Sequence, residues 1–222
     1  MSRYYPVYLD LRGKRCIVVG GGTVAERKAG SLLKSGADVW IVSPDLSGQL
    51  KELVTQKKIG YIKEGFEERH LKDAFLVIGA TDDPSINSRI SREAQRKGIL
   101  VNIVDLPEDC NFIVPSVVER GDLIISVSTC GKSPALSKKI RKELEQRYGE
   151  EYDEFIGLMG EIREYIISEV NNEKKRGIIF QRLVDSEIID LLKKGRRDLS
   201  KEEAIRILRS MGVEGEEFKI RK

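Results

Sequence analysis

The stretch RCIVVGGGTVAERKA occupies residues 15–29, and the predicted fold depends on it. An apolar run ends in three glycines and passes directly into a helical pattern. This order predicts a buried strand, a tight turn and a helix start, with Gly20, Gly22 and Ala25 matching G-x-G-x-x-A. Gly20 permits the turn, Gly22 lets the backbone approach a pyrophosphate, and Ala25 lets the helix pack on the strand. The N-terminus of this helix would then bind the phosphates of a dinucleotide.

Further strands and helices alternate through the first half of the chain. Continuous apolar runs predict strands at 39–42, 60–62, 75–80 and 99–104, with helices between them. Such strands are typical of a parallel sheet that is covered on both faces. We therefore predict an α/β protein with a Rossmann-type parallel sheet.

The pattern changes after residue 112. Two apolar runs, 113–118 and 123–127, flank a polar turn and predict a β-hairpin. A helix should follow from Ala135, with Ser133 as its N-cap and Pro134 in its first turn. From Glu150 onward the pattern is helical. We expect breaks there near residues 171–172, Gly177, Gly195 and Gly212.

We therefore predict three parts. Residues 1–112 form an NAD-binding Rossmann domain, residues 113–148 a small hairpin-plus-helix region, and residues 149–222 a helical C-terminal domain.

The composition narrows the class of protein. The 222 residues carry a net charge of +3, and basic and acidic residues are mixed along the chain, which argues against nucleic acid as a partner. The three cysteines form no C-x-x-C pair, and their odd number argues against a disulfide framework. Neither a secretory leader nor a membrane span is expected. We predict a cytoplasmic protein.

The end of the second strand bears on the choice of cofactor. Dinucleotide folds usually place there an acid that binds the adenosine ribose, but this chain has Ser43, then Pro44 and Asp45. Because no arginine follows to bind a 2′-phosphate, we favour NAD, with Asp45 or the local backbone at the ribose. Residues 43–45 would equally well cap the next helix. Both roles are compatible.

Two further strand ends carry acidic residues. Thr81, Asp82 and Asp83 follow the fourth strand, at the sheet edge where ligands bind, and one of the two acids should cap the helix that begins at Pro84. Asp105 follows the fifth strand. It would either accept a proton from a substrate while the nicotinamide accepts a hydride, or stabilise a turn.

Other polar residues are weaker candidates for a site. His70, the single histidine, lies in a charged stretch, and we expect it in an exposed loop. No cluster has the spacing of metal ligands, so we predict no resident metal. The helix after Pro134 is basic; it forms either a solvated face or a binding surface for a polyanionic substrate.

These residues resemble one family, the precorrin-2 dehydrogenase domain of siroheme synthases, which includes stand-alone dehydrogenases and bifunctional dehydrogenase/ferrochelatases. The matching segments are 18–29, 80–83 with Asn87, 101–105 with Pro107, 112–115 and 126–134. The resemblance implies an NAD-dependent oxidation of precorrin-2 to sirohydrochlorin in siroheme biosynthesis. It also implies a homodimer in which the hairpin and the basic helix exchange contacts between subunits.

The resemblance assigns roles to individual positions. Thr23, Val24, Pro44 and Asp45 match NAD contacts of the family, and Asp105 matches its proposed general base. Precorrin-2 bears eight carboxylates, which several cations would hold. The residues expected to bind it are Asn102, Arg120, Lys132, Ser133, Lys138 and Arg141. Some members carry a phosphorylated serine where this chain has Thr129, which puts that regulation in doubt.

Two alternatives stay open at this stage. The same site would also insert Fe²⁺ into sirohydrochlorin if the chain is bifunctional, since one aspartate can serve both steps. In a different class, a nucleotide-sensing Rossmann module would explain the glycine loop without catalysis. Such modules usually carry an acid where this chain has Ser43.

Overall fold

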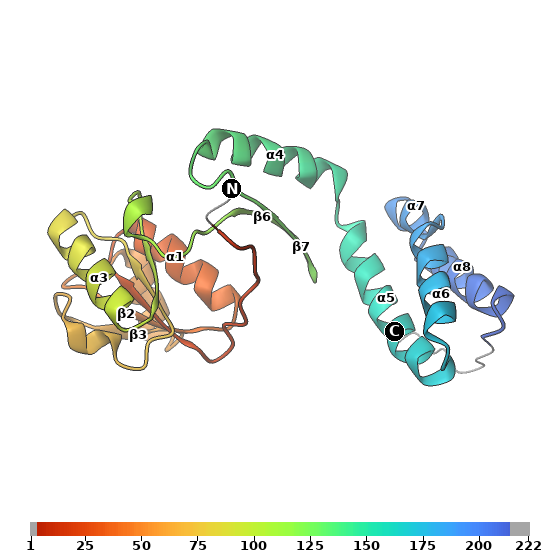
Figure 1. The fold of residues 1–222 in the computed structure, drawn as a ribbon, viewed down its shortest axis with the longest axis horizontal. Helices are drawn as coiled ribbons and strands as arrows, with labels where there is room; N and C mark the ends of the chain where they lie inside the picture. The colour runs from red at the N-terminus through yellow and green to blue at the C-terminus, as the bar shows by residue number, and fades with distance from the viewer. Residues whose placement is uncertain (1–3, 214–222) are drawn as a thin grey trace. The chain divides into compact units, whose positions relative to one another are not determined.

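The computed structural model describes residues 4–213. The chain divides into two compact units, Met1–Val114 and Pro115–Lys222, and each is described separately (Figure 1). The hairpin and all later helices belong to the second unit. The further division of that unit at residue 148 stays a prediction.

The first unit is built on a parallel sheet of five strands in the order β3-β2-β1-β4-β5. Val19 at the end of β1 pairs with Val42 of β2 and with Gly79 of β4, so these strands end at the same edge. This is the predicted Rossmann-type arrangement. The strands are β1 (Arg15–Val19), β2 (Asp38–Val42), β3 (Gly60–Ile62), β4 (Leu76–Gly79) and β5 (Leu100–Ile103).

Successive residues of a strand point to opposite faces of the sheet, and helices cover both of these faces. In β1, Cys16 and Val18 pack into one core with α1 (Thr23–Lys34) and α2 (Gly48–Thr55). Ile17 and Val19 pack into a second core with α3 (Pro84–Arg96). From residue 4 onward this unit also contains two short 3-10 helices, η1 (Glu68–Leu71) and η2 (Pro107–Asp109).

The start of α3 follows from its sequence. Asp83 is the N-cap, and its Oδ1 accepts hydrogen bonds from the backbone N–H of Ser85 at 2.8 Å and of Ile86 at 3.3 Å. The Ser85 hydroxyl donates to the same oxygen at 2.6 Å, and this bond, followed by the two backbone bonds, holds the pKa of the Asp83 carboxyl below its usual value. Pro84 stands in the first turn, where its missing N–H costs nothing. The predicted capping by one of the two acids is confirmed.

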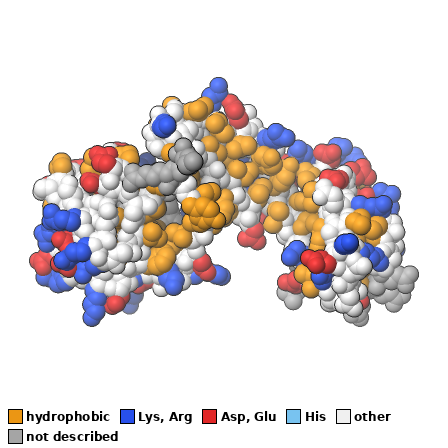
Figure 2. Space-filling model, in the orientation of Figure 1, with side chains coloured by type: hydrophobic (Ala, Val, Ile, Leu, Met, Phe, Trp, Pro, Cys, Tyr) orange, Lys and Arg blue, Asp and Glu red, His pale blue; other side chains and the backbone are white. Residues whose placement is uncertain are grey.

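The second unit begins with the hairpin β6 (Ser116–Arg120) and β7 (Leu123–Val127), followed by α4 (Pro134–Arg147). The first strand begins three residues later than predicted, and its turn is shorter, because Arg120 pairs directly with Leu123. Gly121 in that turn has a φ of +54°. Hydrophobic side chains gather over the hairpin and α4 on the face shown in Figure 2. Two exposed apolar residues of these elements are Val117, at 39%, and Leu136, at 47%.

In the described part of the second unit, four helices with a core of their own follow α4. The predicted break at Gly177 is wrong, because this residue lies inside α6; the break falls after Val184 instead. Ile179 and Leu183 are fully buried on α6, and their packing outweighs the helix cost of one glycine, about 1 kcal/mol. In the described part of the chain, we find no helix long and apolar enough to cross a membrane. The helices are α5 (Glu151–Glu169), α6 (Glu173–Val184), α7 (Ile188–Lys193) and α8 (Arg197–Ser210).

Candidate functional site

The three glycines after β1 have three different environments. Gly20 has a φ of +126°, and a Cβ there would overlap the carbonyl of Ala80. A Cβ at Gly21 would overlap the carbonyl of Asp45. At Gly22, in contrast, a Cβ would meet nothing within 4 Å. Because Gly20 and Gly21 lack a Cβ, the backbone carbonyls of Ala80 and Asp45 can lie against the glycine loop, whereas the space beside Gly22 is open.

That open space lies at the N-terminus of α1. Gly22 is the N-cap of this twelve-residue helix, and no side chain accepts from its first backbone N–H groups. These donors and the positive end of the helix dipole suit an anion. A pocket of about 350 Å³ opens at this point. The predicted residues Gly20, Gly22, Thr23, Val24, Ser43, Pro44, Thr81 and Asp82 all line it. The residues present therefore fit the pyrophosphate of a dinucleotide.

Asp45 does not line this pocket, although its backbone supports the glycine loop. Its carbonyl accepts from the hydroxyl of Ser43 at 2.7 Å and lies against Gly21. The backbone N–H of Ser47 donates to the carbonyl of Gly21 at 2.8 Å, and the Ser47 hydroxyl donates to Glu26 of α1 at 2.8 Å. The Ser43–Ser47 segment thus clamps the glycine loop, and contact between the Asp45 side chain and ribose stays a prediction.

Thr81 and Asp82 form the opposite wall of the pocket. The Thr81 hydroxyl lies 2.9 Å from Oδ1 of Asn87, and the Asn87 amide donates to the Thr81 carbonyl at 2.9 Å. Because Asn87 is buried on α3, it fixes the exit of β4. Asp83 is used as the helix cap, which leaves Asp82 as the carboxylate on this wall.

Asp105 lies at the same edge of the sheet, at the exit of β5. Two strand spacings separate β5 from β1, about 10 Å. Asp105 is exposed and has a φ of +61°, a left-handed conformation that aspartate adopts more readily than most residues. The ammonium of Lys28 on α1 is within electrostatic reach: burial lowers the pKa of Lys28, and the charge of Asp105 opposes that shift.

Three side chains hold the loop that carries Asp105. The sulfur of Cys110 accepts from the N–H of Ile103 at 3.1 Å, and its thiol lies 3.2 Å from the carbonyl of Leu106. The amide of Asn111 accepts from Val101 N–H at 2.7 Å and donates to the Ile99 carbonyl at 2.9 Å. We name Asn102, Cys110 and Asn111 the loop clasp.

Asn102 contributes to the loop clasp through its amide nitrogen. This group donates to the carbonyl of Phe112 at 3.1 Å and lies 3.5 Å from the sulfur of Cys110. Asn102 is itself buried. The structure therefore uses part of this side chain internally, and its contact with a substrate stays a prediction.

The other residues predicted to bind substrate lie in the second unit. Arg120 donates to the carbonyls of Glu119 at 2.8 Å and Glu145 at 3.3 Å, so its guanidinium fixes the hairpin to the end of α4. Arg141 is paired with the Glu145 carboxylate on the same helix. Both arginines therefore have internal partners. Ser133 caps α4, accepting from the N–H of Leu136 at 3.3 Å, as predicted.

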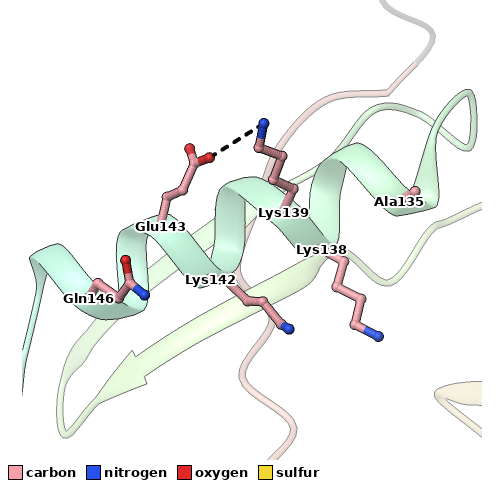
Figure 3. Close-up of a pocket in the computed structure, with 6 residues that line it drawn as sticks. All are labelled: Ala135, Lys138, Lys139, Lys142, Glu143 and Gln146. Carbon is pink, nitrogen blue, oxygen red and sulfur yellow. Dashed lines mark ion pairs between the residues drawn. The ribbon is translucent and has the colours of Figure 1, made fainter.

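Exposed lysines form a stripe on α4. Figure 3 shows Lys138 and Lys142 pointing to one side of the helix, away from Lys139, which lies 3.9 Å from Glu143. Lys132 is exposed ahead of the helix. Sequence reasoning did not single out Lys142; its position one helical turn after Lys138 was the available signal.

Comparisons with known proteins agree with this geometry. Residues 7–116 match the family described as "Putative NAD(P)-binding", and residues 120–147 match "Sirohaem biosynthesis protein central". The siroheme synthase of Photobacterium profundum is 34% identical over 213 residues, 96% of this chain and 45% of the relative. That of Nitrosococcus oceani is 36% identical over 196 residues, 88% of this chain and 42% of the relative.

The chain belongs to the siroheme synthase family. It spans about half the length of these relatives. A solved structure named SirC, precorrin-2 dehydrogenase, superimposes with a TM-score of 0.75 at 27% identity and covers 94% of this chain and 99% of that one. The present chain thus has the same fold as a known precorrin-2 dehydrogenase.

In this family member the hydroxyl of Thr129 is already engaged. It accepts from the N–H of Ser133 at 3.0 Å and lies 3.1 Å from the hydroxyl of Ser137 on α4. Thr129 therefore braces the start of the basic helix. Whether it is modified stays an open prediction.

The expectation of an exposed His70 is wrong. The residue is 5% exposed, and its Nδ1 accepts from the N–H of Glu67 at 3.0 Å. Phe66 and Leu71 are both buried and pack the short helix η1 against the sheet, and His70 is buried because it lies in this helix. A signal was present, because His70 follows the apolar Phe66 at helical spacing. The same segment places Glu64 on the wall of the dinucleotide pocket, which the sequence did not indicate.

Proposed function

We propose that the protein oxidises precorrin-2 to sirohydrochlorin with NAD as hydride acceptor. One observation carries the proposal: the pocket at the uncapped start of α1 shares a sheet edge with the carboxylate of Asp105. The likeness to a solved precorrin-2 dehydrogenase supports it. The proposal includes a cytoplasmic location, where reduced and oxidised nicotinamide are available.

The chain's own residues would bind, orient and remove a proton. The open backbone at Gly22 and the N–H groups of Thr23 and Val24 would hold the pyrophosphate. Bound NAD supplies the acceptor for the hydride that leaves the tetrapyrrole. Asp105 would accept the proton that leaves with it, so that two electrons and two hydrogens are accounted for.

The substrate proposal rests on charge. A tetrapyrrole with many carboxylates needs cations, and the stripe on α4 offers the exposed ammonium groups of Lys138 and Lys142. Lys132 precedes it. Because Arg120 and Arg141 already have internal partners, the lysines are the better candidates.

We further propose a homodimer formed through the hairpin and α4. Exposed apolar side chains at Val117 and Leu136 suit burial against a second copy, because water-exposed apolar clusters mark interfaces. Light scattering after gel filtration should give twice the chain mass. A Val117→Lys variant should shift the protein towards the monomer, and an unchanged mass would oppose this interface.

Iron insertion is a second candidate, favoured by the name of the relatives, siroheme synthase. Among the described residues, no group of three or more His, Cys, Asp or Glu is placed to hold a metal. Iron would therefore enter as substrate, with Asp105 taking protons from the macrocycle. Anaerobic sirohydrochlorin and Fe²⁺, scored against the spontaneous rate, test this activity.

The main experiment is anaerobic turnover of precorrin-2 with NAD, followed by the absorbance of sirohydrochlorin and NADH. We expect Asp105→Asn to lower the rate by about 10²-fold or more, because asparagine keeps the left-handed turn and loses the base. Glu108→Gln, an exposed carboxylate of the same loop, is the matched control. No turnover by the unaltered protein, with tight NAD binding retained, would favour the sensing module instead.

A further inference from the structure

The usual ribose-binding acid is missing from the dinucleotide pocket. The end of β2 carries Ser43, whose hydroxyl donates to the carbonyl of Asp45 at 2.7 Å. The carboxylate of Asp45 is outside the pocket. The pocket therefore has no acidic side chain from the end of β2, where dinucleotide folds normally supply one.

The neighbouring strand supplies a carboxylate instead. β3 pairs with β2, and the N–H of Ser43 donates to the carbonyl of Ile62, the last residue of β3, at 3.2 Å. The N–H of Glu64 donates to the same carbonyl at 2.9 Å, which turns the chain so that Glu64 lines the pocket beside Ser43. The second carboxylate of the lining, Asp82, comes from the opposite wall.

The side chain of Glu64 is tethered through one oxygen. Its Oε2 is paired with Arg69 and lies 3.5 Å from Nε2 of the buried His70. Since Nδ1 of His70 accepts from the Glu67 N–H, the proton of a neutral imidazole is on Nε2, facing Glu64. Within residues 4–213, Oε1 of Glu64 has no hydrogen-bond or ion-pair partner, and the Glu64 side chain is 47% exposed. One oxygen is thus held, and the other is available to accept hydroxyl hydrogens.

The charges around this carboxylate disfavour a phosphate. Arg69 is shared between two carboxylates, those of Glu64 and Glu67, so the three side chains together carry one negative charge. The described lining of the pocket contains no lysine, arginine or histidine. A 2′-phosphate at this point would meet net negative charge without a cation that is free to bind it.

We propose that Glu64, in place of an acid at the end of β2, binds the hydroxyls of the adenosine ribose and makes the site select NAD over NADP. This inference rests on the proposed dinucleotide function. Arg69 acts as a positioning residue, because it holds one oxygen of the carboxylate and does not line the pocket itself. Hydrogen bonds to a carboxylate are strong enough to change affinity by about 10- to 100-fold.

The test is calorimetric titration of the full-length protein with NAD⁺ and with NADP⁺ separately, without substrate. Glu64→Gln keeps the shape and a hydrogen bond to Arg69 but loses the charge. We expect it to raise the Kd for NAD⁺ about 10-fold, because a charged hydrogen-bond acceptor is lost, and to lower the Kd for NADP⁺, because Arg69 and Glu67 then leave no net negative charge beside the ribose. Glu52→Gln, an exposed carboxylate on α2 outside the pocket, should leave both constants unchanged.

The possible outcomes distinguish a failure of this inference from a failure of the proposed dinucleotide-dependent function. If the unaltered protein binds neither dinucleotide, the proposed function fails. If it binds NAD⁺ and Glu64→Gln keeps the same ratio of the two constants, only the role of Glu64 is overturned. A collapse of that ratio in Asp45→Asn, with none in Glu64→Gln, would assign the ribose to Asp45 and overturn the inference as well. Thermal unfolding of each variant checks that it is folded.

Discussion

The backbone N–H of Ile103 donates to the sulfur of Cys110 at 3.1 Å, and this contact closes the loop that presents Asp105. The thiol in turn lies 3.3 Å from the carbonyl of Ile103 and 3.2 Å from that of Leu106. Burial raises the pKa of the Cys110 thiol, so the group keeps its proton and remains a donor at neutral pH. The side chain of Cys110 thereby holds the loop in which Asp105, five residues earlier, adopts its left-handed backbone conformation.

Replacing Cys110 tests whether the loop clasp positions Asp105. Cys110→Val fills the site but removes the acceptor and the donor, and we expect kcat to fall about 10-fold or more, since small displacements of a base are costly. Cys110→Ser keeps both functions and should restore most of the rate. The Kd for NAD⁺ should not change in either variant. Equal loss of kcat in both would show that packing, and not hydrogen bonding, explains the effect.

The glycine loop should separate stability from cofactor binding. Gly21→Ala forces a Cβ into the carbonyl of Asp45, which should lower the free energy of unfolding by about 1–3 kcal/mol. Gly22→Ala meets open space and an ordinary extended backbone, so the midpoint of thermal unfolding should hardly move.

The same Gly22→Ala variant should nevertheless bind NAD⁺ more weakly. Its methyl would occupy the space proposed for the pyrophosphate, an overlap that corresponds to about 10- to 100-fold in Kd. Calorimetric titration and thermal unfolding of both variants measure the contrast. If Gly22→Ala bound NAD⁺ normally, the pyrophosphate would not lie at this glycine.

The sequence was sufficient wherever a structure depends on neighbours along the chain. The caps at Asp83 and Ser133, the prolines that follow them and the five parallel strands are all confirmed. Apolar periodicity and capping preferences are local signals, so they can be read without the fold. Gly177 shows the limit of such signals, because its helix depends on burial against other helices.

The candidate site was predicted only in part, for the same physical reason. Motif spacing indicated the glycine loop and the strand-end residues Thr81 and Asp82, which the pocket brings together. Glu64 and the partners of Cys110 depend on which strands become neighbours and on how a loop folds back on β5. No spacing rule along the sequence contains that information.

The lysine stripe on α4 predicts a directional effect on substrate binding. We expect Lys138→Ala combined with Lys142→Ala to raise KM for the polyanionic tetrapyrrole about 10-fold at low salt and less at high salt, because screening weakens the attraction. Lys139→Ala, which removes a positive charge paired with Glu143 on another side of the helix, should have a smaller effect. Steady-state kinetics at two ionic strengths measures both. If Lys139→Ala raised KM as much as the double variant does, net charge and not a particular surface would explain the binding.

Alkaline pH should destabilise the first unit through Cys16. This thiol is fully buried in β1; burial, and secondarily the charge of Asp38, raises its pKa from 9.0 to about 11. Between those values the unfolded chain releases a proton that the folded chain retains, so stability falls as pH rises through this window and then levels off. Urea unfolding from pH 8 to 11 measures the fall.

Cys16→Ala is the control variant. It starts less stable, because it leaves a small cavity, but should lose less stability with rising pH than the unaltered protein. Lysines and tyrosines titrate alike in both proteins, so the difference between the two curves isolates Cys16, and parallel curves would contradict the assignment.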